Sequence, residues 1–180
     1  FRYARPPQLA EAFYVPDWQM GRYAAAQPPD TAVYLTPTQE EMATIYFAVA
    51  DPERLRSYSG GSELIPVGLP GASALYLVRP TDAASWQALT DFYPDYQADQ
   101  TRPDFWSLLA PDSVAQARQT AVTTATAVSF ADTIHLLGWT AVMDGDQLRL
   151  TLVWQAQAEM SMAYTGFVHV LDADGQMVAQ

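Results

Sequence analysis

The stretch Gln147–Asp174, QLRLTLVWQAQAEMSMAYTGFVHVLDAD, decides how the second half of this chain is interpreted. In its first part Leu148, Leu150, Leu152 and Trp154 alternate with mostly polar residues. Successive side chains of a strand point to opposite faces of a sheet. The pattern therefore predicts a half-buried antiparallel strand whose leucine face lies in a core.

Further strands and tight turns are expected on both sides of this strand. Asp144-Gly145 joins it to a predicted strand over Ile134–Met143, and glycine tolerates the positive φ that a short hairpin loop needs. The next strand is expected over Ala163–Leu171, followed by a turn at Asp172–Gly175 and a return strand. Antiparallel strands joined in this way predict a jelly-roll-like β-sandwich over residues 116–180. Since the strands are few, we expect this sandwich to be truncated at its C-terminal end.

The first half of the chain alternates short apolar strands with amphipathic helices. Ala32–Thr36 and Ala74–Val78 are apolar without alternation, which is typical of strands buried on both faces of a partly parallel sheet. One helix is expected from Pro16, because proline fits the first turn of a helix, and another over about Thr81–Phe92. This alternation predicts a small Rossmann-like α/β domain with an N-terminal helical segment over residues 1–115.

Several shorter features complete this prediction. We expect a helix over Gln8–Tyr14 and an extended piece over Ser62–Val67. Thr38 and Glu41 have the spacing of a capping box, which predicts a further helix start. The Ala-, Thr- and Gln-rich segment Pro111–Thr126 has little apolar periodicity, so we interpret it as the connection between the two domains.

Composition and charge argue against several classes of function. The 180 residues carry a formal net charge of -11, and all nine basic residues are arginine. An acidic surface repels phosphate backbones, so we expect neither nucleic-acid binding nor direct binding to anionic lipid. Without cysteine the chain can form neither disulfides nor thiolate metal sites. Because it opens without Met and stops inside an apparent strand, we interpret it as a fragment of a longer protein.

Candidate catalytic and metal-binding residues have simpler structural explanations. His135 and His169 fall on predicted strands, and Asp172 is the only nearby residue that could join them as a metal ligand. Asp172, Asp174 and Gly175 form a D-x-D-G run, but a calcium loop needs more oxygen ligands and a downstream glutamate. Neither a nucleophile elbow nor a dinucleotide-binding glycine pattern occurs. We therefore expect no catalytic residue, no metal and no cofactor, and a hairpin turn at the aspartates.

Aromatic side chains are the features with the most functional interest. Flat aromatic rings stack on sugar rings and also anchor protein interfaces. The candidate carbohydrate-binding residues are Trp18, Tyr58, Trp106 and Trp139. Trp154 continues the leucine face of its strand, so we expect it in the core.

Part of the chain resembles a module of membrane glycosyltransferases. The runs Leu150–Gln155 (LTLVWQ) and Tyr164–Asp172 (YTGFVHVLD) are followed by Asp174-Gly175 and by Val178-Ala179-Gln180. This order resembles the soluble C-terminal part of bacterial glycosyltransferase family 39 proteins, the dolichyl-phosphate-mannose–protein mannosyltransferase class. Three N-terminal segments also resemble the region that joins the last membrane helix to that module: Phe1–Ala4, Met20–Ala24 and Val33–Pro37.

The resemblance implies a location and a role. The catalytic acidic residue of that family lies between early membrane helices, so the resemblance assigns no catalytic residue to this chain. It implies a non-catalytic accessory domain on the extracytoplasmic face of the bacterial cell membrane, tethered to a parent transmembrane domain. Such a domain would position or recognise a glycan or protein acceptor. The alternative is a carbohydrate-binding module that works through exposed aromatics.

Overall fold

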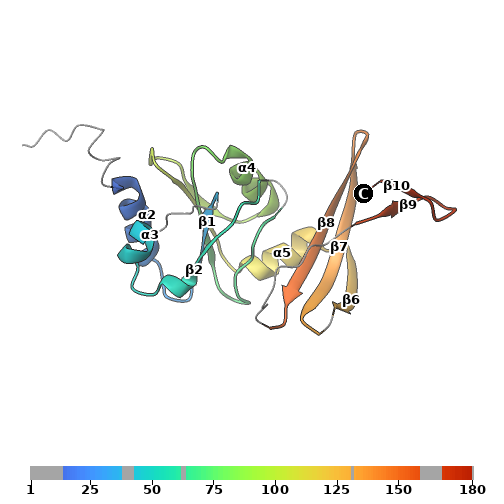
Figure 1. The fold of residues 1–180 in the computed structure, drawn as a ribbon, viewed down its shortest axis with the longest axis horizontal. Helices are drawn as coiled ribbons and strands as arrows, with labels where there is room; N and C mark the ends of the chain where they lie inside the picture. Colours follow the sequence, from blue (N-terminus) through green and yellow to red (C-terminus); the bar gives the residue numbers. More distant parts are fainter. Residues whose placement is uncertain (1–13, 38–42, 62–63, 131, 159–167, 180) are drawn as a thin grey trace, which may run out of the picture.

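The chain is a mixed α/β protein with two main sheets (Figure 1). The computed structural model describes residues 14–37, 43–61, 64–130, 132–158 and 168–179. Its helices are α2 (Val15–Ala25), α3 (Ala43–Ala48), the 3-10 turn η1 (Pro52–Arg54), α4 (Ala83–Phe92) and α5 (Ser113–Ala121). Its strands are β1 (Ala32–Thr36), β2 (Leu55–Ser57), β3 (Ala74–Val78), β4 (Gln97–Asp99), β5 (Trp106–Ala110), β6 (Thr124–Phe130), β7 (Ile134–Asp144), β8 (Gln147–Ala156), β9 (Val170–Leu171) and β10 (Met177–Ala179).

Most of the predicted elements of the first half are present. The helices expected from Pro16 and over about Thr81–Phe92 correspond to α2 and α4. Within Ser62–Val67 the described residues 64–67 are not a strand. The predicted capping box, with Thr38 at its start, and nearly all of the helix expected over Gln8–Tyr14 lie outside the described residues.

The first sheet has five strands in the order β2-β1-β3-β5-β4. Strand β1 pairs in parallel with both β2 and β3, whereas β5 pairs antiparallel with β3 and β4. Strands β1 and β3 coincide with the predicted strands Ala32–Thr36 and Ala74–Val78, and every residue of β3 is buried. The prediction of a partly parallel sheet with buried central strands is confirmed.

Two apolar cores lie on opposite faces of this sheet, one under α2 and α3 and the other under α4 (Figure 1). The first core contains Met20, Ala24, Val33, Leu35, Ile45, Val49, Leu55, Leu75, Leu77 and Phe105. The second contains Tyr58, Ala74, Tyr76, Val78, Leu89, Tyr93, Leu108 and Ala110. Because neighbouring residues of a strand alternate between the two cores, both faces of the sheet are closed to water.

Helix α2 can lie close to α3 because Gly21 has no side chain. A Cβ atom at Gly21 would lie 2.6 Å from the carbonyl oxygen of Ile45 and 2.7 Å from the Cβ of Ala48. Pro16 stands in the first turn of α2, where its missing N–H leaves no hydrogen bond unmade. The position of α2 beside α3 is therefore fixed by close backbone packing.

A cluster of tyrosines fills the second core. The hydroxyls of Tyr76 and Tyr93 lie 2.6 Å apart, and Tyr76 donates a hydrogen bond to the carbonyl oxygen of Pro66. The ring of Tyr34 stacks on Tyr76 and meets Tyr58 edge-on. The hydroxyl of Tyr58 is buried without a hydrogen-bond partner among the described residues. Burial raises the pKa of the hydroxyl of Tyr34, Tyr58, Tyr76 and Tyr93 above its ordinary value.

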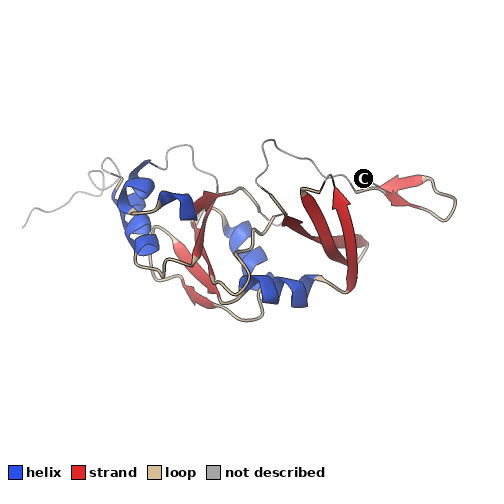
Figure 2. Ribbon diagram, turned by 90° about the horizontal axis from the view of Figure 1, so that it is seen from below, coloured by secondary structure: helices blue, strands red, loops and turns tan. Residues whose placement is uncertain are grey.

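The segment Pro111–Thr126, interpreted from the sequence as a connection, contains a helix that we did not predict. Helix α5 lies between the two sheets (Figures 1 and 2). Its buried residues are Ser113, Gln116, Ala117 and Ala121. These side chains are small or polar, so the sequence shows no large apolar stripe. The predicted domain boundary at residues 115–116 falls inside this helix.

The second sheet is antiparallel, with strand order β6-β7-β8. Strands β7 and β8 form a long hairpin in which Asp144 pairs with Gln147 and Gly145 has φ 62°. The pairing sets Trp139 opposite Leu152 and therefore on the same face. The prediction of an antiparallel hairpin with a turn at Asp144-Gly145 is confirmed.

The covered and open faces of this sheet are the reverse of what we expected. On the leucine face Leu148 and Trp154 remain exposed, whereas Val153 on the other face is buried. Helix α5 covers that other face, where the Thr140 hydroxyl donates a hydrogen bond to the carbonyl oxygen of Ala121. The expectation of a buried leucine face was wrong, because alternation shows which residues share a face but not what covers it.

The last two strands form a separate short hairpin. Asp172 Oδ1 accepts hydrogen bonds from the backbone N–H groups of Asp174, at 3.0 Å, and Gln176, at 2.8 Å. Gly175 adopts φ 77° in the same turn. The turn predicted at Asp172–Gly175 is confirmed, and the carboxylate that could have bound calcium closes this turn.

Replacing Gly138 with valine should weaken the packing of β7 on the chain that leads from α5 into β6. A Cβ atom there would lie 2.4 Å from Val122 Cγ1 and 2.7 Å from the carbonyl oxygen of Thr124. We expect the free energy of unfolding, measured by chemical denaturation, to fall by about 2 kcal/mol, as at other overpacked sites. Ala141→Val adds bulk on the open face of the same strand and should change it by less than about 0.5 kcal/mol. Equal effects of the two substitutions would contradict the packing described here.

Two tyrosine substitutions should change stability in opposite directions. Tyr58→Phe removes a buried hydroxyl that has no partner and should raise the free energy of unfolding by about 1 kcal/mol. Tyr93→Phe removes the hydrogen bond to Tyr76 and should lower it by a similar amount, about 1 kcal/mol. Urea denaturation of both variants beside the wild type measures the difference. Destabilisation by Tyr58→Phe would show that its hydroxyl has a partner.

Alkaline pH should destabilise the protein through the same cluster. Below about pH 10 tyrosines are neutral in both folded and unfolded chains, and the stability is fully present. Above it the unfolded chain releases protons that the folded chain retains, because burial raises the folded pKa values. Each such tyrosine should lower the free energy of unfolding by about 1.4 kcal/mol per pH unit. Tyr76→Phe should lessen this fall in the free energy of unfolding relative to the wild type; a fall of the same size in the variant and the wild type would contradict this explanation.

Candidate functional site

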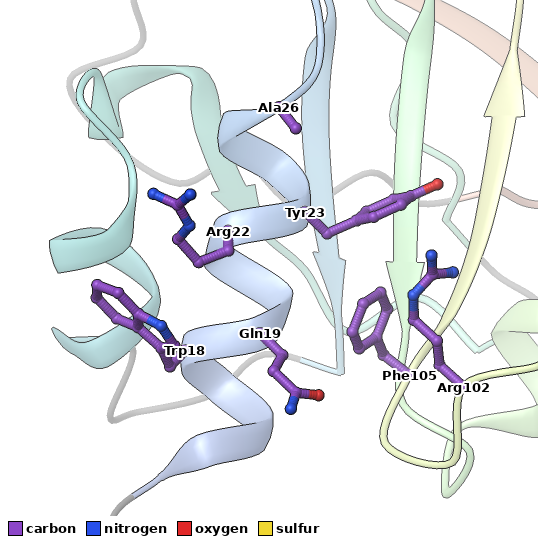
Figure 3. Close-up of a pocket in the computed structure, with 7 residues that line it drawn as sticks. All are labelled: Trp18, Gln19, Arg22, Tyr23, Ala26, Arg102 and Phe105. Atoms are coloured by element: carbon purple, nitrogen blue, oxygen red, sulfur yellow. The ribbon is translucent and has the colours of Figure 1, made fainter.

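An open hollow crosses the outer surface of α2, with a volume of about 450 Å³. It is lined by Trp18, Gln19, Arg22, Tyr23, Ala26, Arg102 and Phe105. The first five belong to α2 and its C-terminal cap, and the last two to the segment between β4 and β5. Figure 3 shows Trp18 and Arg22 on one side of α2, and Tyr23, Phe105 and Arg102 on the other. The volume is in the range of small-molecule sites.

Helical spacing gathers the α2 residues into this hollow. Residues four apart are neighbours on a helix surface, so Trp18, Arg22 and Ala26 form one line and Gln19 and Tyr23 a second. Trp18 and Arg22 lie on the side of α3, where Trp18 contacts Phe47, and Tyr23 lies on the side of the segment that leads into β5 (Figure 3). One helix thus supplies flat rings and hydrogen-bond donors to both sides of the hollow.

We call the side of the hollow formed by Tyr23, Phe105 and Arg102 the inner bank. It is a stacked arrangement of two rings and a guanidinium group. The ring centroids of Tyr23 and Phe105 are 5.6 Å apart. Arg102 Cζ lies 4.4 Å from the centroid of the Tyr23 ring and 5.4 Å from that of Phe105. The Tyr23 hydroxyl is 3.1 Å from Ser107 Oγ, which fixes the ring on β5. A cation held over two aromatic faces keeps its orientation before any ligand arrives.

An ion pair with Asp99 also positions Arg102. The hydroxyl of Thr101, at 2.6 Å, and its backbone N–H, at 2.8 Å, donate to Asp99 Oδ1. These hydrogen bonds, and to a smaller extent Arg102, hold the pKa of Asp99 below its ordinary value. The carboxylate therefore stays ionised well below neutral pH, and the ion pair persists there. An exposed pair of this kind contributes little to folding stability, so its main effect is on the position of the guanidinium.

We call the side of the hollow formed by Trp18 and Arg22 the outer bank. It is open to solvent. The Trp18 side chain is 40% exposed, and its ring centroid lies 6.2 Å from that of Phe47 on α3. Arg22 is exposed, and among the described residues its guanidinium forms no ion pair. Trp18 therefore keeps ring surface available for stacking, with a positive charge one helical turn away.

A partly buried ion pair ties the two banks together. Arg79, which directly follows β3, pairs with Asp17 in the first turn of α2. The same guanidinium donates a hydrogen bond to the carbonyl oxygen of Asp104, next to Phe105. Arg79 thus joins the start of α2 to the segment that carries Arg102 and Phe105.

The lining determines what this hollow can do chemically. Among its residues there is no carboxylate, histidine, serine or threonine. Guanidinium groups stay protonated and offer only donors, so the hollow lacks a general base. Flat rings beside fixed donors suit the binding of a hydroxyl-rich or anionic molecule.

The structure separates the aromatic residues that the sequence singled out. Trp18 lines the hollow, whereas Trp139 lies on the open face of the second sheet. Trp106 is half-buried on β5, where it packs edge-to-face with Trp86. Tyr58, expected to be exposed, lies in the second core with only 8% of its surface accessible. Its ring cannot stack on a sugar, because other tyrosines cover it.

Sequence reasoning missed most of the lining. The four-residue spacing of Trp18 and Arg22 was a local signal that an aromatic ring and a cation share one helix face. Arg102 and Phe105 carried no such signal, since the fold brings them to α2 from a distant part of the chain.

The candidate metal ligands do not form a site in the described part of the chain. His135 lies on β7 opposite Gln155, and His169 directly precedes β9. Across residues 14–37, 43–61, 64–130, 132–158 and 168–179 no three His, Asp or Glu side chains are grouped as metal ligands. The same residues contain no helix that is both long and apolar enough to cross a membrane.

Comparison with known proteins identifies no relative. No protein-family model matches the chain. No curated protein and no solved structure shows significant similarity to it.

Proposed function

We propose that this chain is a non-catalytic, extracytoplasmic accessory domain of a membrane-bound glycosyltransferase that uses lipid-linked sugars. In this role it holds or recognises a carbohydrate acceptor at the outer face of the bacterial cell membrane, next to its parent transmembrane domain. The observation that carries the proposal is the exposed ring of Trp18 beside Gln19 and Arg22, with Arg102 on the other side of α2 in the lining of the same hollow. The resemblance to family 39 proteins supplies the context, and the hollow supplies the binding chemistry.

The lining favours a sugar that carries a carboxylate or phosphate. The Trp18 ring provides a flat apolar surface for the C–H face of a pyranose. Gln19 can donate to and accept from hydroxyls, whereas Arg22 and Arg102 only donate, and guanidinium groups bind carboxylate and phosphate in a bidentate manner. In a chain of net charge -11, a site with an arginine on each bank attracts an anionic ligand that the rest of the surface repels.

The proposal includes a particular architecture for the two halves. The parallel pairing of β1 with β2 and β3, with helices on both faces, supports a Rossmann-like domain. The antiparallel order β6-β7-β8 supplies one layer of a jelly-roll-like sandwich in the second half, whose second β-layer would cover the open face of this sheet. The lack of a general base in the hollow supports a binding role over a catalytic one.

The alternative is a free-standing carbohydrate-binding module, which the exposure of Trp18 favours equally well. The two proposals share one binding site and differ in what the parent gene encodes. Several hydrophobic spans upstream of Phe1 would favour the accessory domain, and a secretion signal alone would favour the module.

Replacing Trp18 with alanine should weaken sugar binding. Neutral hexoses, uronic acids and sugar phosphates would be titrated by calorimetry, and we expect the acidic sugars to bind more tightly. The loss of one stacking ring should raise the dissociation constant of a bound sugar about three- to tenfold. Trp154→Ala is the control, because Trp154 is 42% exposed against 40% for Trp18 but lies on the second sheet. Binding of no sugar, or equal losses in both variants, would refute the proposal.

A further inference from the structure

The open face of the second sheet is a continuous apolar surface. Register places the following residues on that face: Thr124, Val128, Phe130, Ile134, Leu136, Trp139, Ala141, Met143, Leu148, Leu150, Leu152, Trp154 and Ala156. None of them is charged, and all except Thr124, at the edge of the sheet, are apolar, whereas Arg149 and Thr151 of β8 point to the face that α5 covers. We call this surface the leucine face.

Much of the leucine face is accessible to solvent. Val128, Phe130, Trp139, Met143, Leu148 and Trp154 are between 36% and 64% exposed. Side chains of this size present on the order of 150–250 Å² when fully exposed, so these residues leave roughly 500 Å² uncovered. Monomeric proteins rarely expose a contiguous apolar patch of that extent unless it binds something.

We propose that the leucine face is the interface of a homodimer, in which the second sheets of two copies pack face to face. Two such faces together bury roughly 1,000 Å², the size at which a specific interface becomes credible. Flat antiparallel sheets pack this way in β-sandwiches, about 10 Å apart, with their strands nearly aligned. A two-fold axis brings identical patches together, and an apolar surface is complementary to its own copy.

The charge distribution agrees with this arrangement and predicts how dimer formation should depend on ionic strength. Each copy has a net charge of -11, so two copies repel one another, yet the leucine face carries no charge. Salt screens the repulsion and leaves apolar packing intact. The dimer should therefore tighten as ionic strength rises, whereas an interface built from ion pairs would loosen.

The test is sedimentation velocity of the whole chain at several concentrations and ionic strengths, with substitutions on each face of one hairpin. Leu148→Glu places a charge on the leucine face and should raise the dimer dissociation constant at least about tenfold. Val142→Glu is the matched control, since Val142 is 53% exposed against 46% for Leu148 but lies on the opposite face. This control should remain dimeric.

Each result of the sedimentation experiment either supports or overturns the proposed dimer. If Leu148→Glu proves unfolded by circular dichroism, Met143→Glu, at a more exposed position of the same face, replaces it. A wild-type chain that is monomeric at every concentration would overturn the proposal. It would indicate that a different apolar β-layer covers the leucine face. Equal weakening by Val142→Glu, or a dimer that loosens with salt, would also overturn it.

Discussion

Strand β3 (Ala74–Val78) is buried along its whole length, and the rest of the first half is arranged around that burial. Leu75 and Leu77 face the core under α2 and α3, while Tyr76 faces the core under α4. A strand that is apolar on both faces needs a covering layer on each side. Helix α2 supplies one of these layers and also carries most of the hollow, so the candidate site depends directly on the burial of β3.

The second sheet has a covering layer on only one of its faces. Helix α5 lies against the face that contains Gly138 and Val153, and the missing side chain of Gly138 lets β7 approach Val122 directly after the helix. The leucine face has no comparable cover among the described elements. The chain therefore combines one sheet that is closed on both sides with another that is open on one side.

The sequence predicted those elements whose signal is local and apolar. Strands β1 and β3 and the β7–β8 hairpin were found because their residues are strongly apolar or alternate beside a glycine turn. Helix α5 was missed because alanine and serine form its buried face, and Tyr58 was misplaced because its burial depends on neighbours that are distant in sequence. The same reason hid Arg102 from the candidate site, whereas Trp18 and Arg22 share one helix face.

The first sheet is closed on both faces and the second is open on one, and amide hydrogen exchange at low protein concentration tests this difference most directly. We predict that the amides of β3 exchange only through global unfolding, because both faces are buried. The amides of β8 should exchange through a smaller opening, at rates that substitutions in the first core leave unchanged. Equal protection of β3 and β8, with equal sensitivity to denaturant, would contradict the account.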